Sequence, residues 1–317
     1  MFLFLIKRLV RMAACLVAVS ILTFALLQAA PGSFADIQRE LSGSSASTGA
    51  SVSAQADFTE RYGSQVPTWR QYLIFMRGAA TLNMGPTYEF PQLTVQGIIF
   101  KAFGVTAMLA LLAVLLALLL AIPLGVLSAL RRNTASDYGI MFVLTGLVSL
   151  PNYLMGLVLI IVLSVLLHLL PTGGWTGPEN LIMPVLALAF ASAGILARYI
   201  RSSMIETLRE DYVLAAYAKG GRPSAVIVRH ALRNSLLPLV TVTGPLLASL
   251  LTGTVFVETI FQIPGLGLYF ANAARVRDMP LLMGATLFFA LILMTMNLVV
   301  DLTYRILDPR IRYQKGG

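Results

Sequence analysis

Long runs of uncharged, mostly apolar residues constrain the fold of this chain more than any other feature. A helix needs roughly 20 such residues to cross the ~30 Å hydrocarbon core of a bilayer. The third run contains Pro151 and Pro171, so we expect its helix to end near His168, and the fourth is short unless its helix continues past Arg198. The sequence therefore predicts six membrane spans, at residues 12–33, 102–130, 138–178, 181–197, 234–257 and 279–300.

The composition supports a membrane protein. Hydrophobic residues make up 57% of the 317 residues and charged residues only 12%, too few to cover a soluble globule of this size. The first run follows three basic residues, Lys7, Arg8 and Arg11, as the apolar part of a signal peptide would. The run is too long for a typical signal peptide, however, and AAPGS is a weak cleavage sequence. We expect an all-α polytopic membrane protein whose first run is a true span.

The distribution of charge predicts the orientation. If the loops alternate between the two sides, 16 of the 23 basic residues and six acidic residues fall on one side, which gives it a net charge of +10. The other side carries seven basic and eight acidic residues, a net charge of −1. The positive-inside rule then places both termini in the cytoplasm. The overall charge of +9 is explained by topology, so we do not expect nucleic-acid binding.

A basic segment at residues 211–238 separates the fourth and fifth runs. Lys219, Arg222, Arg229 and Arg233 would be costly inside hydrocarbon, so the segment is expected to lie in water on the cytoplasmic side. Gly220 and Gly221 predict a turn, and Pro223 suits the first position of a following helix. Ala215, Ala216 and Ala218 give the preceding helix a smooth surface that another protein can approach closely. The pattern indicates a two-helix docking site.

A large external region is expected at residues 33–100. Its first part is rich in Ser, Ala and Gly, which is typical of a flexible segment. Its second part, with Tyr62, Trp69, Tyr72 and Phe75, could form a small helical cap with an apolar face. Such a helix could lie against the outer membrane interface, where Trp and Tyr are common, or contact an external substrate-delivering protein.

Groups needed for catalysis or metal binding are scarce. Cys15 is the sole cysteine, and His168 and His230 are too far apart in sequence to suggest a metal site. No GxxxxGK[ST] phosphate loop is present, and the spans carry almost no ionisable residue for ion coupling. We therefore predict no catalytic, cofactor-binding or metal-binding residues, so active transport would draw its energy from another subunit.

The basic segment resembles the cytoplasmic EAA loop of ABC importer permeases. Ala215, Ala216 and Gly220 fit that pattern. Leu214 stands at its Glu position, and its Ile and Leu-Pro positions are occupied by His230, Leu232 and Arg233. The AKG and RHALRN strings are similar to the oligopeptide and dipeptide permease branch. So are FLIKRLVRM, NMGPTYEF, LPTGGWTGPEN, VETIFQIPGLG and VDLTYRILDPRIRY, which occur in the order of the first permease subunit of oligopeptide importers.

The resemblance implies a type I ABC importer permease fold with six transmembrane helices and a cytoplasmic coupling helix. The expected organisation is an N-terminal segment and first helix (1–32), the external region (33–100), a permease core (101–304) with a coupling loop at 204–237, and a cytoplasmic tail (305–317). The residues expected to couple to an ATPase are Leu214, Ala215, Ala216, Ala218, Lys219, Gly220 and Arg222, and those of an external loop are Glu258, Pro264, Gly265 and Gly267. In that loop, Pro264 would end regular structure and the two glycines would permit a tight return.

The expected partners are a second homologous permease, two ATPase subunits that bind ATP and Mg, an external solute-binding protein, a peptide substrate and membrane lipid. The expected location is the bacterial inner membrane. Two alternatives remain at this point. The same fold could import nickel, an oligosaccharide or a peptide antibiotic, or the chain could be a stand-alone channel or carrier. The two-helix cytoplasmic segment argues against the second alternative.

Overall fold

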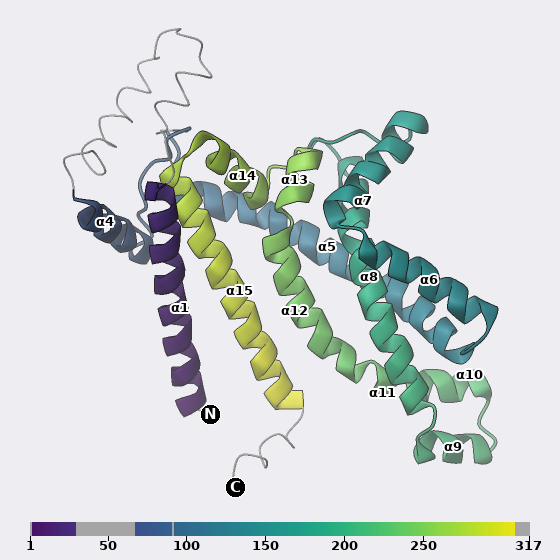
Figure 1. Ribbon diagram of the computed structural model, residues 1–317. Helices are drawn as coiled ribbons and strands as arrows, with labels where there is room; N and C mark the ends of the chain where they lie inside the picture. The colour runs from purple at the N-terminus through teal and green to yellow at the C-terminus, as the bar shows by residue number, and fades with distance from the viewer. Residues whose placement is uncertain (1, 30–66, 91, 308–317) are drawn as a thin grey trace. The chain divides into compact units, whose positions relative to one another are not determined.

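The computed structural model describes residues 2–29, 67–90 and 92–307, and the regular structure in these ranges is helical (Figure 1). The one β-type pairing there is an isolated antiparallel bridge between Pro86 and Thr94. This confirms the predicted all-α class. The Ser-rich part of the expected external region and most of the expected tail lie outside the described residues.

The helices differ widely in length, and two short stretches are π-helical. In chain order they are α1 (Phe2–Ala29), α4 (Thr68–Ala80), α5 (Val95–Leu130), α6 (Ala135–Ser149), α7 (Asn152–Leu159), η1 (Ile160–Leu166), α8 (Glu179–Thr207), α9 (Asp211–Ala218), α10 (Pro223–Val226), η2 (Ile227–Leu232), α11 (Arg233–Ser235), α12 (Leu237–Gly253), α13 (Val255–Phe261), α14 (Leu266–Val276) and α15 (Met279–Leu307).

The predicted apolar runs each contain a helix of the structure. Four described segments are long and apolar enough to cross a membrane: Ile6–Ala29 of α1, α5, α8 and Met279–Thr303 of α15. The third run is α6 followed by α7 and η1, which pass the same test together but are bent by 103°. The bend falls at Pro151, which cannot donate a helical hydrogen bond. The fifth run is α12, only 17 residues long, followed by the short α13.

Several helices extend beyond the apolar runs that predicted them, and α8 and α5 include charged residues in the added part. The helix α8 continues to Thr207, so it includes Arg198 and Arg201, and α5 begins at Val95 rather than at 102, with Lys101 exposed inside it. A charged side chain at the end of a span can reach the polar interface without interrupting the backbone hydrogen bonds. The apolar runs therefore predicted the parts of the helices that can cross the membrane but underestimated the full length of the helices.

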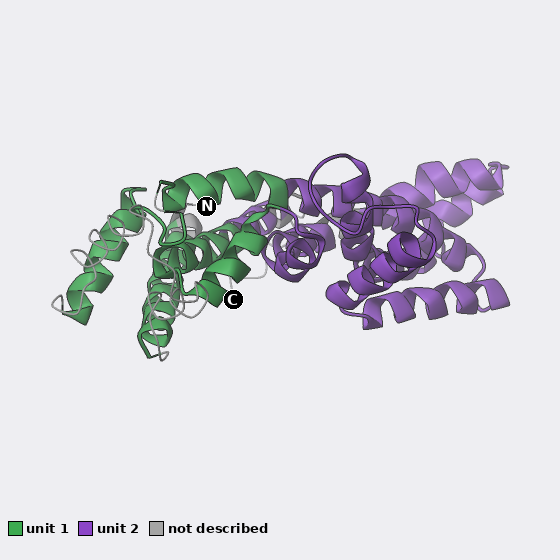
Figure 2. Ribbon diagram, turned by 90° about the horizontal axis from the view of Figure 1, so that it is seen from above, with its two compact units in different colours: residues 1–106, 264–294 green, residues 107–263, 295–317 purple. Residues whose placement is uncertain are grey.

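The chain forms two compact units, which are coloured separately in Figure 2. Unit 1 comprises residues 1–106 and 264–294, and unit 2 comprises residues 107–263 and 295–317. The helices α5 and α15 contribute residues to both. Each unit has buried apolar clusters of its own.

The main core of unit 1 joins α5, α14 and α15. Val95, Leu266 and Leu281 are fully buried within it. The hydroxyl of Thr106 on α5 accepts the backbone N–H of Leu266 at 2.9 Å, which fixes the start of α14. A Cβ at Gly284 would lie 2.6 Å from a methyl group of Val95, so α5 and α15 approach too closely for a larger residue there.

The helix α4 confirms the predicted helical cap with an apolar face. Phe75 is buried against Phe24 of α1, and the hydroxyl groups of Ser20 and Tyr72 are 2.7 Å apart. Trp69 lies on the outward side and is 65% exposed. Whether this outward side meets lipid or another protein stays a prediction.

In unit 2, small residues let helices pack closely around α8. Ala189, Ala193 and Ala197 are buried in a cluster to which α5, α6 and α12 also contribute. A Cβ at Gly194 would lie 2.5 Å from a methyl group of Val148 and 2.8 Å from the carbonyl oxygen of Leu144. The contact between α6 and α8 therefore depends on the missing side chain at residue 194.

Candidate functional site between α8 and α12

The segment between the apolar helices α8 and α12, residues 211–235, is called the α9–α11 segment below. Its first helix, α9, is anchored by Val213, which is completely buried. Leu214, Ala215 and Ala218 are exposed, and Ala216 is half-buried. This helix presents a small-residue surface to solvent, as the sequence pattern predicted.

The turn after α9 needs both of its glycines, for different reasons. Gly220 has φ = +79°, a left-handed conformation that side chains disfavour, although open space surrounds it. Gly221 has an ordinary φ, but an added Cβ would lie 2.7 Å from a methyl group of Val226 and 2.8 Å from the carbonyl oxygen of Ala216. Pro223 then occupies the first turn of α10. The predicted glycine turn and the second helix that begins at Pro223 are confirmed.

Beyond the turn, the chain returns to the bundle through α10, η2 and α11. Val226 and Ala231 are buried, and Ala231 packs with Met204 of α8 and Ala129 at the end of α5. The hydroxyl of Ser235 also contacts the sulfur of Met204 at 3.4 Å. The α9–α11 segment is therefore packed directly against α8 and the end of α5.

Two predicted cations of this segment, Lys219 and Arg222, lie exposed at the turn. Leu214, Ala215, Ala218 and Gly220 are also exposed, and only Ala216 and Tyr217 between them are half-buried. The structure thus brings the predicted coupling residues together on a short helix and its turn. Their role in contacting an ATPase stays a prediction.

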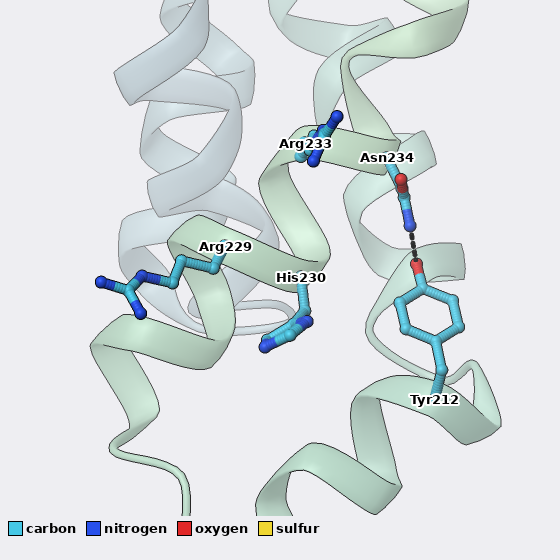
Figure 3. A pocket seen from close by; sticks show the side chains of 5 residues that line it. All are labelled: Tyr212, Arg229, His230, Arg233 and Asn234. Atoms are coloured by element: carbon cyan, nitrogen blue, oxygen red, sulfur yellow. Dashed lines mark hydrogen bonds between the residues drawn. The ribbon is translucent and has the colours of Figure 1, made fainter.

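A polar pocket lies beside these residues (Figure 3). Its volume is about 380 Å³, and two of the residues that line it are joined by a hydrogen bond of 2.8 Å from the side chain of Asn234 to the hydroxyl of Tyr212. Arg229, His230 and Arg233 supply the basic lining. The RHALRN string contains four of the five residues that line the pocket, but the sequence could not show that Tyr212 on α9 lines it as well.

The predicted external residues do not form one loop. Glu258 lies in α13, fully buried, and its carboxylate accepts a hydrogen bond of 2.6 Å from Thr254. Gly267 lies within α14, and Gly265 is the residue before that helix with φ = −89°. The helix α13 had already ended at Phe261, before Pro264. Pro264 and Gly265 therefore lie in the connection between α13 and α14, whereas Glu258 and Gly267 lie in the flanking helices, and the external position of all four stays a prediction.

The tight return instead occurs at Gln262. This residue has φ = +53° and ends α13 in the left-handed conformation that often terminates helices. Its side-chain amide donates to the carbonyl oxygen of Thr259 at 2.7 Å, and the same oxygen accepts its backbone N–H at 3.3 Å. Sequence reasoning favoured the glycines because Gln rarely adopts this conformation, and a local side-chain bond compensates for it here.

Unit 1 holds a buried carboxylate that the sequence analysis did not single out. Asp278 is inaccessible to solvent and accepts backbone N–H groups from Tyr88 at 2.9 Å, Glu89 at 3.1 Å and Leu281 at 3.2 Å. Burial raises the pKa of Asp278 to about 6, partly opposed by these hydrogen bonds. Burial also raises the pKa of Glu89, against the influence of Arg275. Asp278 thereby ties the 83–90 loop to the start of α15.

Within the part of the chain that the structure describes, no group of three His, Cys, Asp or Glu side chains could hold a metal ion. The site is instead an exposed two-helix projection with a basic pocket at its base. Such a surface can bind a partner and transmit a movement.

Comparison with known proteins identifies the family. Residues 121–313 match the model described as "Binding-protein-dependent transport system inner membrane component". The chain belongs to this family. It is therefore a membrane-embedded component of a transport system, not an enzyme.

Relatives extend the similarity over nearly the whole chain. The dipeptide transport system permease protein DppB of Bacillus subtilis (strain 168) is 38% identical over 314 residues, which cover 99% of both chains. The oligopeptide transport system permease protein AppB of the same organism is 36% identical, over 98% of this chain and 99% of that protein. The oligopeptide transport system permease protein OppB of Haemophilus influenzae (strain ATCC 51907 / DSM 11121 / KW20 / Rd) is 33% identical, with the same coverage.

Solved structures agree on the fold. A chain of the MetNI methionine ABC transporter in an inward-facing conformation superposes with a TM-score of 0.57 at 17% identity, covering 67% of this chain and 96% of that one. A chain of an amino acid ABC transporter crystallised with histidines gives a TM-score of 0.51 at 16% identity, covering 66% and 93%. The family member thus has the helical fold of type I ABC importer permeases.

Proposed function

We propose that this chain is one permease subunit of an ATP-driven importer of dipeptides or oligopeptides. The observation that carries the proposal is the exposed helix and left-handed glycine turn of the α9–α11 segment, which lies between the apolar helices α8 and α12. The names of the relatives support peptides over nickel, an oligosaccharide or a peptide antibiotic. The alternative, a stand-alone channel or carrier, would have no use for such a projection.

In this function the chain forms half of the translocation pathway with a homologous permease. Two ATPase subunits bind ATP and Mg and contact α9 through Ala215, Ala216 and the turn at Gly220. Closure of the ATPase dimer moves the α9–α11 segment, and the packing of Ala231 on Met204 passes the movement into α8. An external solute-binding protein delivers the peptide. This chain itself carries out no chemistry.

Co-purification and transport test the proposal. The chain is expressed with the permease, ATPase and binding-protein genes of its own system, and the complex is purified in mild detergent and reconstituted. We expect the ATPase to co-purify and radiolabelled dipeptide or oligopeptide to enter vesicles only with ATP and the binding protein. ATP-independent uptake by the single chain would show that it is a carrier. Uptake of nickel but not of peptide would overturn the proposal that peptides are the substrate.

The orientation is tested by thiol labelling. The exposed Cys15 is first replaced by Ala, and single cysteines are introduced at Glu179 or at Ser224, both exposed positions. In intact cells an impermeant maleimide should label residue 179 and should label residue 224 only after the membrane is opened. Labelling of residue 224 in intact cells would place the α9–α11 segment outside and overturn the proposal.

A further inference from the structure

The pocket at the base of the α9–α11 segment is lined by five side chains, three of them basic and none acidic. Figure 3 shows Arg229 and His230 on η2, Arg233 on α11, and Tyr212 on α9 with its hydroxyl pointing toward Asn234. The hydrogen bond between Asn234 and Tyr212 holds these two polar groups together at one side. All five side chains are exposed, so the pocket is open to solvent, and its excess of basic side chains favours an anion.

The arginines of this pocket are not neutralised by the chain itself. Among the described residues, the ion pair of Arg201 with Asp137 is present, whereas neither Arg229 nor Arg233 forms an ion pair or a side-chain hydrogen bond. Guanidinium groups present several donors in a fixed plane and match the oxygens of phosphate groups well. Two unpaired guanidinium groups beside one pocket favour phosphate as its ligand.

The position of the pocket along the chain matches the depth of lipid headgroups. Arg233 precedes the first residue of α12 by four positions, about 6 Å at 1.5 Å per helical residue. The polar layer on each side of a bilayer is about 5–7 Å thick, from the difference between its total and hydrocarbon thickness. If α12 enters hydrocarbon near its start, the basic side chains lie at the level of the headgroups.

Exposed apolar side chains close in sequence to the pocket residues favour a lipid over a free anion. Val228, which directly precedes Arg229, is 60% exposed, and Leu214, two residues after Tyr212 on α9, is 53% exposed. A soluble phosphate would gain nothing from them, whereas the upper part of an acyl chain would bury their surface. Basic pockets at the cytoplasmic end of membrane helices are suited to anionic lipids for the same electrostatic reason.

We propose that the pocket lined by Tyr212, Arg229, His230, Arg233 and Asn234 binds the phosphate of an anionic phospholipid headgroup. The inference rests on the proposed function for its cytoplasmic, membrane-facing orientation. A bound lipid would brace α9 against η2 and α11 and so set the position of the segment that the ATPase contacts. Transport would then depend on the anionic lipid content of the membrane.

Lipid binding is measured directly on the purified transporter complex. A short-chain phosphatidylglycerol is titrated into the complex in neutral detergent and bound lipid is counted by native mass spectrometry, with phosphatidylcholine as the zwitterionic comparison. We expect Arg229→Gln and Arg233→Gln each to weaken phosphatidylglycerol binding about fivefold and the double variant about thirtyfold, from roughly one charge interaction per arginine. Arg132→Gln is the matched control, because Arg132 is exposed on the loop between α5 and α6 and does not line the pocket.

The source of the phosphate is resolved by competition. If the site takes lipid, millimolar inorganic phosphate should displace little phosphatidylglycerol, and phosphatidylcholine should bind more weakly by a similar factor in the parent and control proteins. The opposite result is that the parent binds inorganic phosphate, the double variant does not, and the parent shows no preference between the two lipids. That result would overturn the lipid as the ligand and assign the pocket to a free anion. Equal phosphatidylglycerol binding by the double variant and the parent would overturn the site altogether.

Failure of this inference is distinguishable from failure of the proposed function. Co-purification of the ATPase and the melting temperature are recorded for every variant. Loss of ATPase from the double variant with unchanged lipid binding would show that the pocket receives an acidic group of the ATPase, which overturns the lipid site and keeps the importer. Lack of ATPase association in the parent protein would instead overturn the importer.

Discussion

Arg201 donates to both carboxylate oxygens of Asp137, from Nε at 2.8 Å and from a terminal nitrogen at 2.6 Å. The pair joins α8 to the first turn of α6 across 64 positions of sequence. Asp137 is 1% exposed and also accepts a hydrogen bond from Ser128 and one from the backbone of Asn133 at 3.0 Å. This carboxylate therefore connects the end of α5, the following turn, α6 and α8.

Removal of one partner of this pair should be costly. Arg201→Gln leaves a buried carboxylate without its cation, and we expect a loss of about 3 kcal/mol in the free energy of unfolding. Asp137→Asn combined with Arg201→Gln should lose less than Arg201→Gln alone, because no charge is then left buried. Denaturant unfolding in detergent measures both variants. A double variant less stable than Arg201→Gln would contradict this account.

The close contact at Gly194 predicts a steric effect. Gly194→Ala should destabilise the fold by about 1–3 kcal/mol, because the added methyl group meets both Val148 and the Leu144 carbonyl of α6. Gly139→Ala is the matched control, because a Cβ at Gly139 of α6 meets nothing within 4 Å. Melting temperatures of the two purified variants provide the comparison. Equal melting temperatures would show that α6 can shift to accept the methyl group.

The turn at Gly220 predicts a loss of coupling without loss of folding. Gly220→Val should strain the left-handed backbone by about 1–2 kcal/mol and shift the turn, whereas Gly220→Asn should be better tolerated because Asn adopts this conformation more readily. We expect ATP-dependent uptake to fall for Gly220→Val and to be largely kept for Gly220→Asn, at equal membrane abundance. Similar uptake by both variants would show that coupling does not depend on the left-handed conformation at residue 220.

The half-buried Ala216 tests the contact with the ATPase. Ala216→Asp would place an unpaired charge in the interface, at a cost of several kcal/mol. Both ATPase co-purification and uptake should fall, while the variant still inserts in the membrane. Parent-level uptake by Ala216→Asp would show that α9 is not the coupling element.

The buried Asp278 predicts a pH dependence of stability. Its pKa in the folded protein is about 6, above the ordinary value of 3.8. The contribution of the protonated group is therefore fully present below about pH 4 and is lost as the pH rises through 6, by up to about 3 kcal/mol. Asp278→Asn should remove this dependence between pH 4 and 7. The free energy of unfolding of both proteins is measured from pH 4 to 7. The same pH dependence in the parent and in Asp278→Asn would be inconsistent with the raised pKa.

Much of the fold follows from the sequence because the decisive physics is local. Apolar length, set by the cost of placing charges in hydrocarbon, located a helix in each of the six predicted runs. The pair Gly220–Gly221 followed by Pro223 predicted the turn correctly, because φ preferences depend on each residue and its immediate neighbours. The same local rules gave α4 its buried and exposed faces.

The tertiary structure decided what depends on residues distant in sequence. The sequence contains Asp137 and Arg201 but does not say that they meet, and it does not show that Tyr212 and Asn234 close a pocket around Arg229 and Arg233. It also favoured glycines for a return that Gln262 makes, because a side-chain hydrogen bond stabilises a conformation that propensity disfavours. Pairings across the bundle are fixed by packing and by the need to satisfy buried charges, and neither can be read from one stretch of chain.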